Sequence, residues 1–187
     1  MHVSIRHIGL IVGIFASLVS FLFFGRQQET YLLLLFAGHL ISGVCFLWIL
    51  FGRGSLKSKL FWTGIVAVGV ALSWISENYF INISYRIYLY QSRKELAATN
   101  DILKNLSGEV LIMNDSISID NGPTLLPSDK QRLLNMKEKL GTYIILKTDS
   151  TIYYGLWGFL DVRHGLTYSI SGVQLKEQKH LIGNWYY

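Results

Sequence analysis

Three long stretches without a formal charge occupy most of the N-terminal part of the chain. They run over 8–25, 31–52 and 60–76. A helix needs about 20 apolar residues, with a lower limit of about 17, to cross the hydrocarbon core of a bilayer, and each stretch is long enough. Helices of a soluble core carry a polar stripe, whereas these stretches are apolar all round. The pattern predicts three transmembrane helices within residues 1–80.

Short connections and small residues predict how these helices pack. The segments between them, 26–30 and 53–59, are too short for anything but antiparallel neighbours, which favours an up-down-up bundle. Small side chains let helices approach closely in lipid. The candidate contact residues are Gly13, Ala16, Ser17, Ser20, Gly38, Ser42, Gly43, Gly64, Gly69 and Ala71. The first stretch is longer than a signal-peptide core, which spans roughly 7–15 residues, so we expect it to be retained.

Basic residues near the predicted helices indicate an orientation. The second connection carries Arg53, Lys57 and Lys59, whereas the first carries Arg26 beside Glu29. The positive-inside rule then predicts a cytoplasmic N-terminus and a C-terminal domain outside the membrane. Three basic residues that follow the third stretch count against this orientation: Arg86, Arg93 and Lys94.

Residues 81–106 admit two interpretations. No Gly or Pro occurs between 78 and 106, and Leu89, Leu96 and Leu103 recur at heptad spacing, which favours a helix that continues from the third span. Apolar and polar residues alternate over 81–89, which is typical of a strand instead. Ser92 and Glu95 have the spacing of a capping box. We expect a helical extension or linker with a break near Ser92.

From residue 107 onward, short β-type stretches alternate with turns. Strands are predicted over 109–113, 116–119, 142–148, 151–157, 166–171 and 180–187, and residues 120–123 form a strong turn. One helix starts at the second capping box, Ser128 with Gln131, and stops at Gly141. The fold class is therefore membrane all-α, with three transmembrane helices, plus a small C-terminal α+β domain with an antiparallel sheet. Its parts are 1–80, 81–106 and 107–187.

Charge and cysteine content narrow the functional classes. Only 16% of residues are charged, against about 25% in soluble domains. The net charge of +5 lies in residues 1–106, with nine basic and four acidic residues, while residues 107–187 hold eight of each. A neutral domain does not predict nucleic-acid binding. Cys45 is the one cysteine, which excludes an internal disulfide and a thiolate metal site in the domain. The absence of cysteine from residues 107–187 favours a bacterial inner-membrane protein.

Two ionisable residues fall within or beside the apolar stretches. His39 lies inside the second stretch and Glu77 ends the third. Ionisable side chains inside a membrane are costly and often functional. The simpler interpretation is a neutral His39 hydrogen-bonded to a neighbouring helix and a solvated Glu77 at the interface. A small oligomeric transporter built around His39 is the alternative.

The densest polar cluster of the domain lies between two predicted strands. Asp161, Arg163 and His164 stand between Gly158 and Gly165, and binding residues are often carried by loops on a rigid sheet. The simpler interpretation is a turn in which Arg163 pairs with Asp161. Trp157 belongs to a group of aromatic residues that line either a pocket for sugar or peptide or the sheet core: Tyr153, Tyr154, Trp157, Phe159, Trp185, Tyr186 and Tyr187.

The sequence predicts binding rather than catalysis. It holds no spacing typical of a nucleophile and its base, no regular set of metal ligands and no phosphate-binding or dinucleotide fingerprint, so we expect no catalytic residues, metal or cofactor. The expected function is a membrane protein whose outer domain binds or senses a ligand, or serves as an accessory subunit beside a protein partner or second copy. The alternative is a membrane-bound enzyme with a site at 161–164.

Overall fold

The computed structural model describes residues 4–25, 28–120, 125–159 and 162–187. The chain folds as two compact units, residues 1–84 and 85–187. The division falls inside one long helix, α3 (Leu56–Gln91), whose last turns belong to the second unit.

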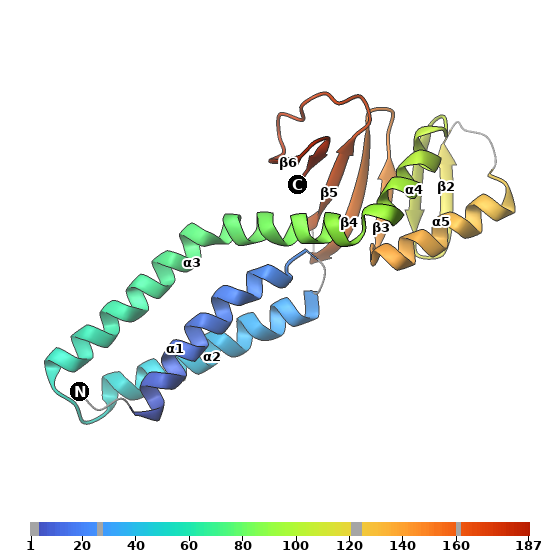
Figure 1. Cartoon of the computed structure of the whole chain (residues 1–187). Coiled ribbons are helices and arrows are strands. Elements are labelled where there is room, and N and C mark those ends of the chain that lie inside the picture. Colours follow the sequence, from blue (N-terminus) through green and yellow to red (C-terminus); the bar gives the residue numbers. More distant parts are fainter. Residues whose placement is uncertain (1–3, 26–27, 121–124, 160–161) are drawn as a thin grey trace. The chain divides into compact units, whose positions relative to one another are not determined.

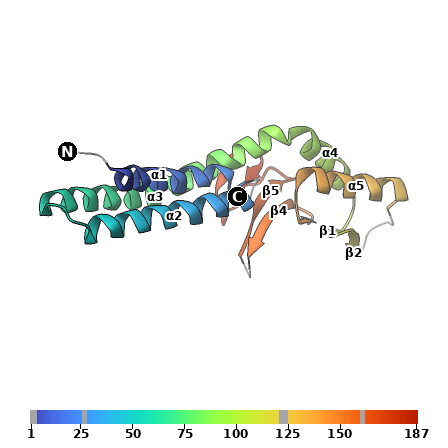
Figure 2. The ribbon, with the colours of Figure 1, turned by 90° about the horizontal axis from the view of Figure 1, so that it is seen from below.

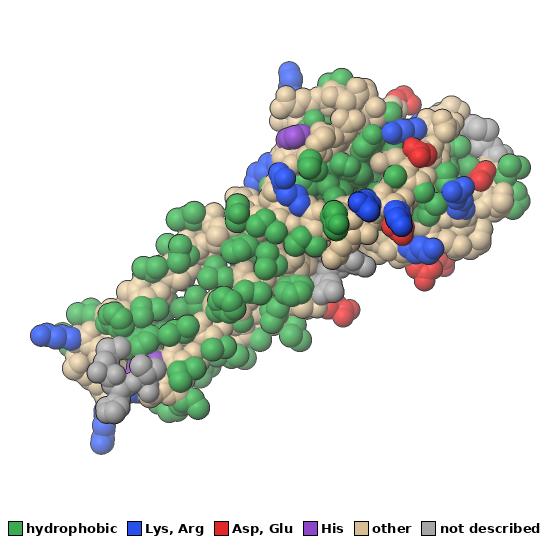
Figure 3. Space-filling view, in the orientation of Figure 1, with side chains coloured by type: hydrophobic (Ala, Val, Ile, Leu, Met, Phe, Trp, Pro, Cys, Tyr) green, Lys and Arg blue, Asp and Glu red, His purple; other side chains and the backbone are tan. Residues whose placement is uncertain are grey.

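The first unit is helical. It holds α1 (Ile5–Ser20), a short 3-10 turn η1 (Phe21–Phe23), α2 (Gln28–Phe51) and the part of α3 that ends at Ser84. Three helical segments are long and apolar enough to cross a membrane: Ile5–Phe23, Glu29–Phe51 and Leu56–Gln91. Large apolar side chains such as Phe51 and Trp74 are 85% and 84% exposed, and such side chains cover this unit in Figure 3. This surface suits lipid, not water.

Helices α1 and α2 pack side by side through their small residues (Figures 1 and 2). A Cβ atom at Gly13 would lie 2.6 Å from the Ser42 amide nitrogen and 2.7 Å from the Gly38 carbonyl oxygen. A Cβ at Gly38 would lie 2.7 Å from the Ser17 nitrogen. The two backbones therefore touch at this crossing, as the small residues predicted. At Gly43 and Gly64, by contrast, nothing lies within 4 Å of where a Cβ would stand.

Helix α3 joins this pair through Trp62. Its indole is buried with Leu10 of α1 and Ile49 of α2, and the His7 ring stacks on it with centroids 4.4 Å apart. Aromatic pairs of this kind are worth about 0.5–1.5 kcal/mol beyond the area they bury. The start of α3 is thus fixed against both other helices.

In the second unit the chain remains helical as far as Lys104. Helix α3 ends at Gln91, and α4 (Arg93–Lys104) begins after a break at Ser92, so the strand interpretation of 81–89 is wrong. The predicted capping box at Ser92 does not form, because its side chain makes no cap hydrogen bond. Helix α5 (Pro127–Leu140) begins just before the predicted box, with Pro127 at its first position. It ends, as predicted, at left-handed Gly141.

Seven strands form one antiparallel sheet. They are β1 (Glu109–Met113), β2 (Ser116–Asp120), β3 (Ile144–Lys147), β4 (Thr151–Phe159), β5 (Val162–Ser169), β6 (His180–Ile182) and β7 (Trp185–Tyr186). Their order is β2-β1-β3-β4-β5-β7-β6. Three apolar helices and a small α+β domain with an antiparallel sheet are the predicted fold class, which is confirmed.

The core of the second unit lies between one face of this sheet and the helices α4 and α5, which lie on the same side of it (Figures 1 and 2). Ile112, Ile145, Tyr154 and Leu166 are paired across four neighbouring strands, and each is fully buried. The helices contribute Leu96, Leu103, Leu133 and Leu140, all at most 2% exposed. Each fully buried side chain of this size contributes about 1.5–3 kcal/mol.

Candidate functional site

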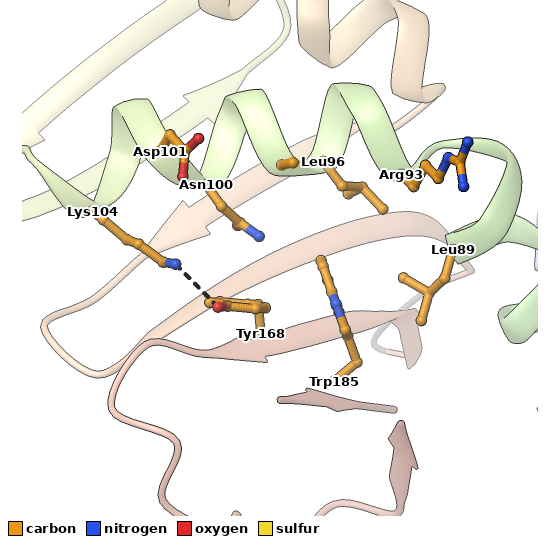
Figure 4. A pocket seen from close by; sticks show the side chains of 9 residues that line it. Leu89, Arg93, Leu96, Asn100, Asp101, Lys104, Tyr168 and Trp185 are labelled. Carbon is orange, nitrogen blue, oxygen red and sulfur yellow. Dashed lines mark hydrogen bonds between the residues drawn. The ribbon is translucent and has the colours of Figure 1, made fainter. Parts of the chain in front are cut away.

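A pocket of about 260 Å³ opens in the second unit between α4 and the strands β5 and β7 (Figure 4). Its lining combines an indole, a phenol, aliphatic side chains, two cations, an amide and one carboxylate. These residues are Leu89, Arg93, Leu96, Ala97, Asn100, Asp101, Lys104, Tyr168 and Trp185. A concave site with apolar walls and a few converging polar groups is the usual form of a small-molecule site.

Helix α4 supplies one side of the pocket, because one of its faces packs into the core and a neighbouring face borders the pocket. Leu96, Thr99 and Leu103 point into the core, and the Thr99 hydroxyl group lies 3.5 Å from Met136 Sδ on α5. The adjacent positions 93, 97, 100 and 104 recur at the i, i+3 and i, i+4 spacing, so they share a neighbouring face of the helix. This face borders the pocket.

Asn100 is the buried polar group of the pocket. It is 5% exposed, and the Tyr154 hydroxyl donates a 2.7 Å hydrogen bond to its Oδ1. Burial raises the pKa of Tyr154 well above its usual value, so this phenol keeps its proton and remains a donor. With Oδ1 engaged, the amide nitrogen of Asn100 points toward Tyr168 and Trp185 (Figure 4). A hydrogen-bond donor is therefore held in a fixed direction.

Lys104 and Tyr168 form the polar end of the pocket. Lys104 Nζ donates a 3.0 Å hydrogen bond to the Tyr168 hydroxyl and lies 4.7 Å from the centre of the ring. This hydrogen bond is the main reason that the pKa of Tyr168 lies below its usual value. A hydrogen bond from Asn184 adds to the effect, and partial burial opposes it. Tyr168 is thus a more acidic phenol than a tyrosine in water.

Trp185 forms the apolar wall beside these groups. Its ring meets Tyr154 at a centroid distance of 5.7 Å and Tyr168 at 5.0 Å, the latter edge to face. Two neighbours thereby fix the plane of the indole, which stands between Tyr168 and Leu89 in Figure 4. A pre-oriented ring loses little entropy when a flat ligand packs on it.

Replacing Lys104 with Met should raise the pKa of Tyr168 toward the ordinary value of about 10, because the main cause of the depression is removed. The ¹³Cζ resonances of labelled tyrosine, followed from pH 7 to 12, measure this change. Because the pKa of Tyr168 is lower in the folded chain than in the unfolded chain, its pairing with Lys104 stabilises the fold at pH values above the unfolded-state pKa. This stabilisation is lost as the pH falls through the folded-state pKa of Tyr168. Lys94→Met, on an exposed part of the same helix, should leave the titration unchanged.

Two of the residues predicted at 157–164, Trp157 and His164, are neighbours on two strands. Trp157 of β4 pairs with His164 of β5, and their rings lie 4.2 Å apart at 30°. Burial lowers the pKa of His164, so the imidazole is neutral at pH 7. The prediction of a loop was wrong at its C-terminal side, because β5 begins at Val162 and includes Arg163 and His164. Asp161 lies outside the described residues.

His39 bridges two helices of the first unit. Its Nδ1 lies 2.7 Å from the Leu35 carbonyl oxygen, to which it must donate, and 3.2 Å from Ser17 Oγ on α1. A cavity of about 100 Å³ adjoins it, with Ser17, Ser42 and Ser73 at its border. Glu77 is half-buried on α3. Among the residues that the structure describes, no three His, Cys, Asp or Glu side chains gather to hold a metal ion.

The sequence pointed to some of this pocket and missed the rest. Trp185 and Tyr154 belong to the predicted group of aromatic residues. Asn100, Lys104 and Tyr168 were not named, and Arg93 was considered only for the orientation. The sequence did contain one signal, which is the helical spacing of positions 93, 97, 100 and 104. This row of positions lies beside the repeat of Leu89, Leu96 and Leu103. Nothing in the sequence placed that face opposite β5 and β7, because those strands are far along the chain.

Comparison of the chain with protein-family models, with curated proteins and with solved structures finds no match.

Proposed function

We propose that this chain is an integral membrane protein whose C-terminal domain binds a small molecule, either as a sensor or as the binding subunit of a larger membrane complex. The observation that carries the proposal is the pocket beside α4, which has a pre-oriented amide donor, a lysine–tyrosine pair and a fixed indole. Each group is held by a neighbour before any ligand arrives, and such pre-organisation lowers the entropic cost of binding.

The proposal places the N-terminus in the cytoplasm and the domain outside a bacterial inner membrane. Its support is the charge at one end of the helical unit, where α2 is joined to α3. Arg53 lies in this connection, Lys57 and Lys59 lie in the first turn of α3, and the Arg6 guanidinium group lies 2.5 Å from where a Cβ at Gly52 would stand. The described residues at this end include no Asp or Glu. Such a cluster favours the cytoplasmic side.

Ligand screening by hydrogen exchange tests the proposed function. The full chain in lipid nanodiscs is incubated with pools of neutral, cationic and anionic small molecules, and amide exchange is followed by mass spectrometry. We expect at least one pool to slow exchange in peptides from α4 and from β5 to β7, because a ligand that binds the folded state stabilises it.

Filling the pocket supplies the control for this screen. Ala97 lines the pocket and is exposed, so Ala97→Trp should occupy the space without removing a polar group and should abolish the protection. Lys94→Trp adds the same ring at an exposed position outside the pocket and should leave it intact. Protection that survives in Ala97→Trp, or a screen without any protected peptide, would contradict the proposal.

A further inference from the structure

Two polar side chains of the pocket, Asn100 and Lys104, offer hydrogen-bond donors to it. The Asn100 oxygen is engaged by Tyr154, so its NH₂ group is the part that faces the pocket (Figure 4). Lys104 carries three donors and no acceptor, and one of them is used on Tyr168. A ligand group that accepts several hydrogen bonds fits this arrangement.

Tyr168 adds a further donor. Its oxygen accepts a 3.0 Å hydrogen bond from Lys104. A hydroxyl group also carries one O–H donor, which can rotate toward a new acceptor, and Tyr168 borders the ligand space. Asn100, Lys104 and Tyr168 thus present three donors of different kinds, which is the complement of an oxyanion.

The charge of the lining agrees with this pattern. Arg93 and Lys104 contribute two positive charges against the single carboxylate of Asp101. Lys104 Nζ points toward Tyr168 and Trp185, whereas the Arg93 guanidinium group lies at the other end of α4, beyond Leu96 (Figure 4). It rests 5.4 Å from the ring of Tyr90. The positive charge that is hydrogen-bonded to a lining residue is that of Lys104.

The rest of the pocket is apolar. Trp185 offers a ring whose plane is fixed by Tyr154 and Tyr168, and Leu89, Leu96 and Ala97 complete the lining. The volume of about 260 Å³ lies just below the range of roughly 300–1,000 Å³ that is typical of drug-sized ligands. A flat body of one ring matches this space.

We infer that the pocket takes a small organic acid with a flat apolar body, with its carboxylate held by Asn100, Lys104 and Tyr168 and its ring packed along Trp185. This inference rests on the proposed function, because it assigns the ligand class of the same site. A carboxylate accepts shorter and stronger hydrogen bonds than a neutral group does. Replacing the carboxylate by a neutral amide should therefore weaken binding by about tenfold or more.

Matched probes test the ligand class on the full chain in lipid nanodiscs. Phenylacetate, phenylacetamide and phenethylamine share one ring and differ in charge. The protein is labelled with 5-fluorotryptophan, and its Trp185 signal is assigned by loss of the resonance in Trp185→Phe. We expect phenylacetate to shift the ¹⁹F signal of Trp185 with a Kd at least about tenfold below that of phenylacetamide, and phenethylamine to bind more weakly still.

Substitution of Lys104 identifies the group responsible. Lys104→Met should bring the Kd values of the acid and the amide within about twofold of each other, whereas Lys94→Met should preserve the difference. Binding of the amide or the amine as tight as that of the acid would overturn the ligand class but leave the proposed function standing. Absence of any Trp185 shift with millimolar phenylacetate would also overturn the ligand class. The hydrogen-exchange screen then decides the proposed function separately.

Discussion

Replacing Gly165 with Ala should destabilise the C-terminal domain by about 3 kcal/mol, in the upper part of the range for overpacked sites. Gly165 of β5 is paired with Gly155 of β4 in the middle of the sheet. An added Cβ would collide with the carbonyl oxygen of Tyr154 and would lie 2.9 Å from Cε2 and Oη of Tyr153. The carbonyl belongs to the neighbouring strand, so relief requires a shift of the sheet backbone and not a change of rotamer.

The measurement is hydrogen exchange of the full chain in nanodiscs, with protection read from peptides within 107–187. Gly64→Ala is the matched control, because nothing lies within 4 Å of the Cβ added there, and it should leave protection in the domain unchanged. Combining Gly165→Ala with Tyr153→Ala discriminates between causes. Because the backbone carbonyl remains, we expect no recovery, and full recovery would show that the Tyr153 ring alone is responsible.

The same pair of glycines shows the limit of prediction from sequence. A glycine within a strand pattern signals a bulge or a close approach, and the sheet has a register shift between Gly155 and Trp157. The sequence alone, however, does not say which side chain fills the space. Tyr143 lies over Gly155 and Tyr153 over Gly165. These contacts depend on strand register, which local patterns constrain only weakly.

The helical unit was the more predictable part. A long run without charge is a strong signal because an unpaired charge in hydrocarbon is costly, and the three helices follow such runs closely. Gly13, Ser17, Gly38 and Ser42 were expected at a helix contact and lie at one. The same reasoning named Gly43 and Gly64, which have open space beside them, because small residues permit a close approach without requiring it.

The candidate site was the less predictable part. Sequence reasoning favoured 157–164, where three polar residues lie close together along the chain. The pocket instead joins Asn100 and Lys104 to Tyr168 and Trp185, which lie far along the chain on the other side of the α5 segment. Such a site arises from the order of strands in the sheet, where β5 and β7 are neighbours. Pairing of that kind is set by tertiary contacts and carries no local signature.

Lys147 links the sheet to the end of α4. This residue is 4% exposed, and its Nζ donates hydrogen bonds of 2.8 Å to the Leu106 carbonyl oxygen and 2.7 Å to that of Gly108. Both oxygens belong to the short segment that follows α4. The buried cation of Lys147 therefore satisfies two backbone acceptors in the segment between α4 and β1.

Replacing Lys147 with Met should cost about 2–4 kcal/mol of domain stability, because two part-buried backbone carbonyls lose their donor. Methionine fills much of the same volume and removes the cost of burying a charge, which works in favour of the variant. The two acceptors are backbone carbonyls and remain after the substitution, and a buried polar group left unsatisfied costs about 1–3 kcal/mol. The loss of both hydrogen bonds therefore outweighs the gain.

Urea-dependent pulse proteolysis of the full chain in detergent measures this loss, with the C-terminal domain followed by an antibody to a tag at its end. Lys176→Met is the control, because Lys176 is exposed in the segment between β5 and β6, and it should unfold at the same urea concentration as the unmodified protein. A Lys147→Met variant as stable as this control would mean that water replaces the lysine at both carbonyls. The end of α4 would then be accessible to solvent, and the pocket that α4 borders would have a less rigid wall than the buried lysine implies.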